Sequence, residues 1–417
     1  MLPLNPDERR NVALLFLFGF GTAAAYVVAR TVADSQFLSR VGPEQLPRMY
    51  LVAAGVVAVV SAIYGRFASR STVKLSVAIT LLVLAIISAM MPEIIHRYPH
   101  SKLAMASVYI LAQIRGTLGT IQFTMLLNDK FARRRPERVV GYVGIGSTLA
   151  GFLGGVSLSH VINTLDVATF MYVVAVIDLL TLIPIALISR STSRGAVLFD
   201  ESFFWADSTA PGEESLDSSG RSSRKVFYLA AMVAVCVCAS TFVEYQWKVT
   251  AADAFERDEL ALAKYFGNFY GYIYLVTGAL QFFVTGQVLR KRGLLTGLLV
   301  FPLSILVAST AILVASTGRA VLWAVTMAKG ADAFKRSLND PSIHILYGRM
   351  SKSNRHRAVT VIAGMIKPIT EAIAALSLVL LVPGISSRSL SGIVVVLAFI
   401  WVVLSVRVWR GFDADKQ

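Results

Sequence analysis

The sequence predicts an all-α membrane protein whose chain crosses the bilayer twelve times. Of its 417 residues, 55% are hydrophobic and 16% are charged, and the mean hydropathy is +0.64. Apolar runs of about 20 residues, the length that spans a bilayer as a helix, recur along the chain. These runs are continuous, whereas a membrane β-barrel would show alternating apolar and polar residues. A soluble fold and a β-barrel are therefore both excluded.

The first six spans are separated by short polar or basic loops. The first follows Arg9 and Arg10 without a cleavage signal, so we expect it to remain as a helix whose amino end is cytoplasmic. The apolar runs predict spans at about 11–33, 47–66, 72–92, 103–128, 139–164 and 168–189. The last six spans follow a polar stretch, and their loops carry further basic residues. They are expected at about 226–250, 262–289, 294–316, 319–345, 357–383 and 390–409.

The distribution of basic residues predicts the orientation. Lysines and arginines concentrate in every second loop, as cytoplasmic loops do, and this explains the net charge of +15. Basic runs such as 133–135 and 290–292 occupy short loops without interleaved aromatic residues, so anionic lipid headgroups and not nucleic acids are the expected partners. Short loops, few cysteines and no organelle targeting predict a bacterial inner membrane, with both termini in the cytoplasm.

A polar segment divides the chain into two halves. Residues 190–225 are rich in serine, glycine and acidic residues and are expected to form a cytoplasmic linker. It would join a six-helix bundle of residues 1–189 to a second bundle of residues 226–417, which ends in a short cytoplasmic tail. Leu127-Asn128-Asp129 is echoed by Leu338-Asn339-Asp340 at the end of the matching spans. Repeated halves are typical of secondary transporters, and six plus six helices favour a major-facilitator-like architecture.

The sequence also limits the chemistry. Neither a glycine-rich phosphate-binding loop nor a soluble domain to carry one is present, so the chain is not expected to hydrolyse ATP or to act as an enzyme. Cys236 and Cys238 lie in one apolar span, and the five histidines show no metal-ligand spacing. We expect no cofactor and no metal, a monomer, and transport driven by exchange or by an ion gradient.

Cations inside the predicted spans are the main functional signal, because a charge in hydrocarbon needs a partner or a wet cavity. Three of these cations have an acid one helical turn away, in the pairs Arg30 with Asp34, Lys248 with Glu244, and Lys367 with Glu371. For these pairs, a self-neutralised helix face and a substrate contact both remain open. The seven intramembrane cations are Arg30, Arg115, Lys248, Lys329, Lys335, Arg336 and Lys367.

The remaining cations are less well compensated. Lys329, Asp332 and Arg336 share one face of the tenth span, while Lys335 points elsewhere, and one acid cannot neutralise three cations. Arg115 has no acid within a turn of its own helix, and Gly116 beside it leaves room for a ligand or a close helix. The excess of positive charge suits a polyanion.

Two motifs carry a resemblance to a known family. The segment Phe242-Val243-Glu244-Tyr245-Gln246-Trp247-Lys248 resembles the Glu-x-x-Trp-Lys motif of the ATP/ADP translocase (nucleotide transporter) family. Lys335-Arg336-Ser337-Leu338-Asn339-Asp340-Pro341, followed by Tyr347, is similar to the Lys-Tyr-Ser-Leu-Phe-Asp-Pro segment of that family. Fainter matches extend over nearly the whole membrane region.

The resemblance implies a twelve-helix major-facilitator-like fold and obligate exchange of nucleotides. It implies that Glu244, Lys248 and Lys335 match charged motif positions, and that Arg30 and Lys367 match basic ones. The chain departs from the family at Gln113-Ile114-Arg115-Gly116, where the family has Glu-Leu-Trp-Gly, and after Pro341, where Ser342-Ile343-His344 replaces Thr-Lys-Glu.

The leading hypothesis is a secondary transporter that exchanges a phosphorylated, nucleotide-like anion by alternating access. A proton-coupled carrier of another organic anion or lipid-linked precursor is one alternative, and a non-transporting membrane partner protein is another. The predicted substrate-binding residues are Arg30, Arg115, Glu244, Lys248, Lys329, Lys335, Arg336 and Lys367. The predicted structural or gating residues are Asp34, Gln113, Asp332, Asp340 and Glu371.

Overall fold

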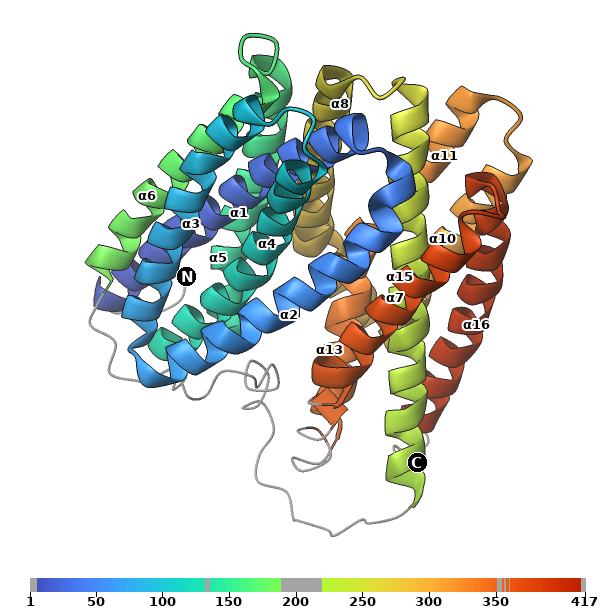
Figure 1. Ribbon diagram of the computed structural model, residues 1–417. Helices are drawn as coiled ribbons and strands as arrows, with labels where there is room; N and C mark the ends of the chain where they lie inside the picture. The colour runs from blue at the N-terminus through green and yellow to red at the C-terminus, as the bar shows by residue number, and fades with distance from the viewer. Residues whose placement is uncertain are drawn as a thin grey trace. The chain divides into compact units, whose positions relative to one another are not determined.

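The described part of the chain consists of helices, most of which are connected by short turns (Figure 1). The computed structural model describes residues 6–131, 136–188, 220–350, 355, 358–359 and 361–413, and each regular element among these residues is helical. The predicted all-α class is therefore confirmed. The basic run 133–135 and residues 190–219 of the expected linker lie outside the described residues.

The first half of the chain contains long helices joined by tight connections. Gly42, with a φ of 98°, makes the turn that follows α1. Thr72 caps the amino end of α3, where its hydroxyl accepts a hydrogen bond from the Leu75 amide. The helices are α1 (Pro6–Arg40), α2 (Leu46–Arg70), α3 (Val73–Arg97), α4 (Lys102–Phe131), α5 (Pro136–Val161) and α6 (Phe170–Leu187), with short 3₁₀ turns at η1 (Pro43–Gln45) and η2 (Val167–Thr169).

The second half differs because π-helical segments interrupt its helices. These segments are η5 (Leu280–Thr285), η6 (Lys335–Asn339) and η7 (Ile362–Ile366). Residues 220–225, expected in the linker, form the start of α7. The α-helices are α7 (Gly220–Ala254), α8 (Glu259–Ala279), α9 (Gly286–Lys291), α10 (Gly293–Val314), α11 (Gly318–Gly330), α12 (Asp332–Phe334), α13 (Asp340–Gly348), α15 (Lys367–Leu381) and α16 (Ser387–Asp413).

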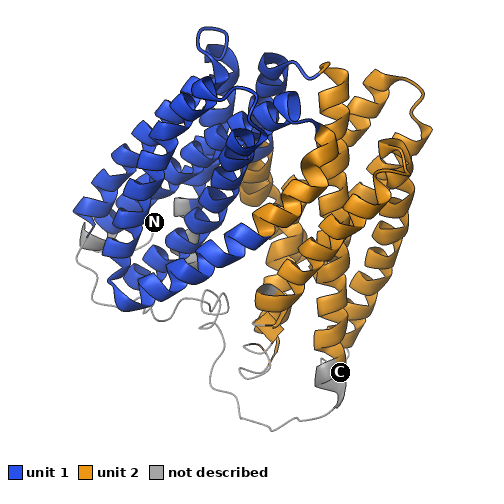
Figure 2. Cartoon of the chain, in the orientation of Figure 1, with its two compact units in different colours: residues 1–42, 55–199, 257–275 blue, residues 43–54, 200–256, 276–417 orange. Residues whose placement is uncertain are grey.

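The chain divides into two compact units (Figure 2). Unit 1 comprises Met1–Gly42, Gly55–Phe199 and Arg257–Leu275, and unit 2 comprises Pro43–Ala54, Asp200–Glu256 and Val276–Gln417. Each unit thus includes one segment from the other half of the sequence. The predicted division into bundles of residues 1–189 and 226–417 stays a prediction.

Each unit is built around one central helix. In unit 1, α1 packs against α4, α5 and α6, and α3 packs against α6. The first part of α8 lies against α5, where a Cβ added to Gly155 would approach the Gly271 backbone nitrogen to 2.6 Å, so only glycine permits this approach. In unit 2, α7 packs against α11, α15 and α16, and α10 packs against α11 and α16.

Nine helical stretches among the described residues are long and apolar enough to cross a membrane. Many large apolar side chains point outward, including Ile86 at 53% and Leu180 at 57% exposure in unit 1, as expected for lipid-facing surfaces. The chain is an integral membrane protein. The predicted spans at 103–128, 139–164 and 319–345 are helical as well but are not among these nine, so the number twelve stays a prediction.

Candidate functional site

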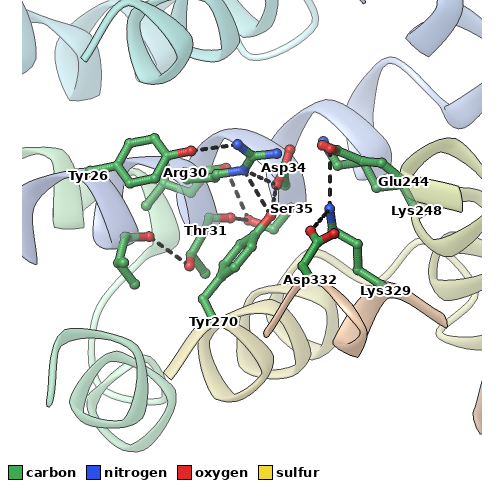
Figure 3. Close-up of polar contacts among 12 residues, drawn as sticks. Tyr26, Arg30, Thr31, Asp34, Ser35, Glu244, Lys248, Tyr270, Lys329 and Asp332 are labelled. Carbon is green, nitrogen blue, oxygen red and sulfur yellow. Dashed lines mark hydrogen bonds and ion pairs between the residues drawn. The ribbon is translucent and has the colours of Figure 1, made fainter. Parts of the chain in front are cut away.

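In unit 1, Arg30 lies between two tyrosines (Figure 3). Its Nη1 donates to the Tyr26 hydroxyl at 2.5 Å and its Nε donates to the Tyr270 hydroxyl at 3.0 Å. The Tyr270 hydroxyl in turn donates to Asp34 Oδ2 at 2.6 Å, and Arg30 forms an ion pair with the same oxygen at 3.5 Å. The predicted pair of Arg30 with Asp34 is therefore present, but a tyrosine from α8 completes it.

In the Arg30 cluster, which comprises Tyr26, Arg30, Asp34 and Tyr270, the cation is partly exposed and the acid is buried. The Arg30 side chain is 15% exposed and the Asp34 side chain is 1% exposed. The guanidinium carbon lies 5.9 Å from the Tyr26 ring centroid and 5.6 Å from the Tyr270 ring centroid, within the range of cation–π attraction. The cluster thus presents a partly accessible cation flanked by aromatic rings.

Arg115 has its acid partner on another helix. Its Nη1 lies 2.5 Å from Asp178 Oδ1 on α6, and its Nη2 donates to the Ser88 hydroxyl on α3 at 2.7 Å. The two side chains of the ion pair are 4% and 1% exposed, so the pair is buried in unit 1. The charge of Arg115 is therefore neutralised by an acid on another helix, and the sequence of α4 alone does not reveal this partner. Gln113, two residues earlier, is half-buried.

In unit 2, two lysines share one carboxylate (Figure 3). Lys248 Nζ lies 3.0 Å from Glu244 Oε1, and Lys329 Nζ lies 3.4 Å from Glu244 Oε2. Lys329 also donates to Asp332 Oδ2 at 2.6 Å. Lys248 is fully buried and Lys329 is 8% exposed. The predicted pair of Lys248 with Glu244 is present and extends into a chain of four charges between α7, α11 and α12.

Aromatic rings border these lysines. Lys329 Nζ lies 5.9 Å from the Trp247 ring and Lys248 Nζ lies 5.6 Å from the Tyr50 ring. Both distances permit a cation–π contribution, which grows when the cation is desolvated. Trp247 is fully buried beside Lys329.

The remaining predicted residues of unit 2 lie around η6 and the start of α15. Lys335 is half-buried within electrostatic range of Asp332, Asp340 and the Cys236 thiol. Glu371 lies within range of Lys335, Lys367 and Glu244. Arg336, Lys367 and Glu371 are exposed.

The predicted partnership of Lys367 with Glu371 is looser than expected. Among the described residues, these two side chains form no ion pair within 4 Å, although they lie within electrostatic range of each other. The residues of the two motifs are thus neighbours in unit 2, with Lys335 and Lys367 held less tightly than Lys248 and Lys329.

Several contacts of these clusters were not predicted from the sequence. Tyr26 lies four residues before Arg30, so helical spacing could have identified it. Tyr270 and Asp178 come from distant helices and leave no local signal. A further ion pair joins Arg40 to Glu259 on α8 at 2.7 Å, and Gln36 donates to the same carboxylate at 3.2 Å.

No cluster of histidine, cysteine and acidic side chains suited to a metal ion occurs in the part of the chain that the structure describes. The chemistry of both units is instead that of fixed cations beside acids and aromatic rings. Such groups can bind anions through hydrogen bonds and charge.

Comparison with known proteins identifies the fold. No protein-family model and no curated protein matches the chain. The structure is similar to the nucleoside transporter NupG, with a TM-score of 0.66 and 12% identity, over 96% of this chain and 100% of that one. A bacterial homologue of the iron transporter ferroportin matches with a TM-score of 0.65 and 13% identity, over 96% of this chain and 98% of that one.

The human organic anion transporter MFSD10 is also similar, with a TM-score of 0.58 and 12% identity, over 96% of this chain and 100% of that one. These likenesses extend over nearly the whole chain, so the fold is the major-facilitator fold that the repeated halves predicted. The resemblance to the ATP/ADP translocase family rests on the two sequence motifs.

Proposed function

We propose that this protein is a secondary transporter that exchanges a phosphorylated, nucleotide-like anion through alternating access. One observation carries the proposal: basic side chains from α7, α11, η6 and α15 gather in unit 2 around fewer acids. The cations are Lys248, Lys329, Lys335, Arg336 and Lys367, and the acids are Glu244, Asp332, Asp340 and Glu371.

The accessible members of this cluster suit phosphate oxygens. Lys335 and Lys367 form no ion pair within 4 Å among the described residues, and Arg336 is exposed. A guanidinium binds a phosphate through two parallel hydrogen bonds, and a lysine binds it as a point charge. These three residues are our proposed phosphate contacts, with Lys329 available if a phosphate displaces Glu244 or Asp332.

The unit 1 residues are assigned two different roles. Arg30 is partly exposed beside Tyr26 and Tyr270, so it remains a proposed substrate contact. Arg115 is buried against Asp178, which favours a bracing role over the substrate contact predicted for it. Gln113 and Asp34 stay proposed structural or gating residues.

The names of similar structures agree with an organic anion containing a nucleoside. NupG is called a nucleoside transporter and MFSD10 an organic anion transporter, and a nucleotide combines both features. We favour exchange because the cations outnumber the acids in this cluster, and a bound anion would supply the missing counter-charge while the carrier reorients. The expected setting is a monomer in a bacterial inner membrane, with both termini cytoplasmic.

Transport by reconstituted protein tests the proposal. Proteoliposomes loaded with ADP should take up labelled ATP, and vesicles loaded with buffer alone should not. Lys335→Gln should reduce uptake at least tenfold, because a phosphate loses about 1.4 kcal/mol or more of charge-assisted binding. The exposed Lys102, at the start of α4, provides a matched control, and Lys102→Gln should leave uptake unchanged. A wild-type protein that exchanges no nucleotide under any gradient would contradict the proposal.

A proton-coupled carrier of another organic anion is the second candidate, and Glu371 favours it. This exposed carboxyl forms no direct hydrogen bond or ion pair among the described residues, so it would be the proton-binding group of such a carrier. Under this alternative, an imposed pH gradient would drive uptake without counter-substrate, and Glu371→Gln would abolish that dependence. Uptake that ignores the pH gradient would exclude it.

A further inference from the structure

We infer that Gln281 and Thr285, on η5, are positioning residues that hold η6 in its π-helical register and thereby orient Lys335 and Arg336 toward the anion. The part of this inference that concerns the anion rests on the proposed function. The part that concerns the helix register rests on hydrogen bonds within unit 2 alone.

Pro341 interrupts the backbone hydrogen bonding of the helix that follows η6. Pro341 has no backbone N–H, so the carbonyl of Ser337, four residues earlier, has no α-helical donor. The Asp340 amide donates to the Lys335 carbonyl, five residues earlier, instead of to Arg336. Two consecutive carbonyls, those of Arg336 and Ser337, are thereby released from the helical ladder.

Both released carbonyls accept hydrogen bonds from η5. Gln281 Nε2 donates to the Arg336 carbonyl at 3.2 Å, and Thr285 Oγ1 lies 2.7 Å from the Ser337 carbonyl. Thr285 has one hydroxyl hydrogen to donate. Its Oγ1 lies farther from the Leu280 carbonyl on its own helix, at 3.1 Å, so the Ser337 carbonyl is the nearer acceptor. In an α-helical register the Asp340 amide would bind the Arg336 carbonyl, so the Gln281 bond favours the π form of η6 directly. Pro341 leaves the Ser337 carbonyl without a helical donor in either register, so Thr285 satisfies this carbonyl and fastens η6 to η5.

The register decides where the neighbouring cations point. A π turn contains one residue more than an α turn, and each residue advances an α-helix by about 100°. Conversion of η6 to an α-helix would therefore rotate Lys335 and the preceding Lys329 by about that angle relative to α13. Lys335 and Arg336 are the first two residues of η6, where this rotation begins.

A second π segment has the same construction. The Lys367 amide donates to the Ile362 carbonyl, five residues earlier, and Pro368 follows directly. Lys367 is also one of the proposed phosphate contacts. A π segment followed by proline thus adjoins a proposed anion contact twice in unit 2. This recurrence agrees with the frequent occurrence of π segments at functional sites.

Substitutions of Thr285 separate positioning from general stability. Thr285→Val keeps the shape but removes the donor, and we expect it to raise the KM for ATP exchange at least fivefold with a smaller change in kcat. Thr285→Ser retains the hydroxyl and should restore the KM. Thr310 on α10 offers a control because its hydroxyl bonds only within its own helix, and Thr310→Val should leave both constants unchanged.

A second experiment reads the register without any transport. In a background of Cys236→Ala and Cys238→Ala, the reaction rate of Arg336→Cys with a water-soluble thiol reagent reports the orientation of η6. Combining Thr285→Val with Pro341→Ala restores an internal donor for the Ser337 carbonyl, so the α form should return and the rate should change several-fold. Thr310→Val should not change it.

Different results would contradict the positioning role and the nucleotide as substrate. An unchanged labelling rate in the Thr285→Val, Pro341→Ala protein would overturn the positioning role, whether or not ATP is exchanged. An altered rate in a protein whose wild type exchanges no nucleotide would support the positioning role and remove the nucleotide from the proposed function. A Thr285→Ser protein that behaves like Thr285→Val would also overturn the inference, because the hydroxyl would then be irrelevant.

Discussion

Unit 1 and unit 2 both bury cations, but they neutralise them in different ways. In unit 1, Arg115 is fixed by Asp178 and Ser88, which come from two other regular α-helices. In unit 2, Lys329 shares Glu244 with Lys248 and also contacts Asp332. A buried cation with a single acid cannot lose that acid without a large cost, whereas cations that share acids can exchange partners.

Backbone regularity follows the same division. All three π segments among the described residues belong to unit 2, and two of them directly adjoin proposed anion contacts. A carboxylate shared between two cations allows a local exchange of partners, and π segments occur frequently at functional sites. Arg115 in unit 1 is therefore held by fixed partners, whereas the lysines around Glu244 in unit 2 have partners that they can exchange.

Removal of Arg115 should have the largest effect. Arg115→Leu leaves the Asp178 carboxylate buried at 1% exposure without its cation, which typically costs about 3 to 5 kcal/mol. Thermal or chemical denaturation in detergent micelles measures the loss in the free energy of unfolding. The double variant Arg115→Leu, Asp178→Leu should regain most of it, because no uncompensated charge remains. A cost below about 1 kcal/mol for the single variant would remove the bracing role.

Removal of Lys248 should have a smaller effect, although Lys248 is the more deeply buried cation. Glu244 retains Lys329 at 3.4 Å, so Lys248→Met should cost about 1 to 3 kcal/mol in the same assay. The double variant Lys248→Met, Lys329→Met should cost more than the sum of the single variants, since Glu244 then loses both partners. Strictly additive costs would show that the carboxylate is not shared in the folded protein.

Local sequence patterns predicted the pairs that lie on one helix. Arg30 with Asp34 and Glu244 with Lys248 are four residues apart, and both pairs are present because helical spacing places such residues side by side. The all-helical class and the major-facilitator fold were predictable for a similar reason, because span length and repeated halves are properties of the sequence itself.

Tertiary partners could not be predicted in this way. Asp178 lies 63 residues from Arg115 along the chain, and Tyr270 lies 240 residues from Arg30. No spacing rule connects such residues, so Arg115 looked uncompensated. Lys367 and Glu371 show the reverse limitation: the spacing was correct, but both side chains are exposed and no direct ion pair forms between them. The π segment η6 accepts hydrogen bonds from another element, η5, so its stabilisation is visible only in the structure.

The ion pair at the end of α1 should have the smallest effect, because water reaches it. The Arg40 and Glu259 side chains are 25% and 18% exposed, and ion pairs of this kind contribute about 0 to 1 kcal/mol. Glu259→Gln preserves the shape of the side chain. Its new amide could also donate to Gln36 Oε1, which is buried without a hydrogen-bond partner among the described residues. The free energy of unfolding should therefore fall by less than 1 kcal/mol.

In the wild type, the small contribution of the Arg40–Glu259 ion pair should shrink further between low and high salt. A loss above 2 kcal/mol that salt does not change would place this pair with Arg115 as a brace and extend the rigid behaviour of unit 1 to its exposed contacts.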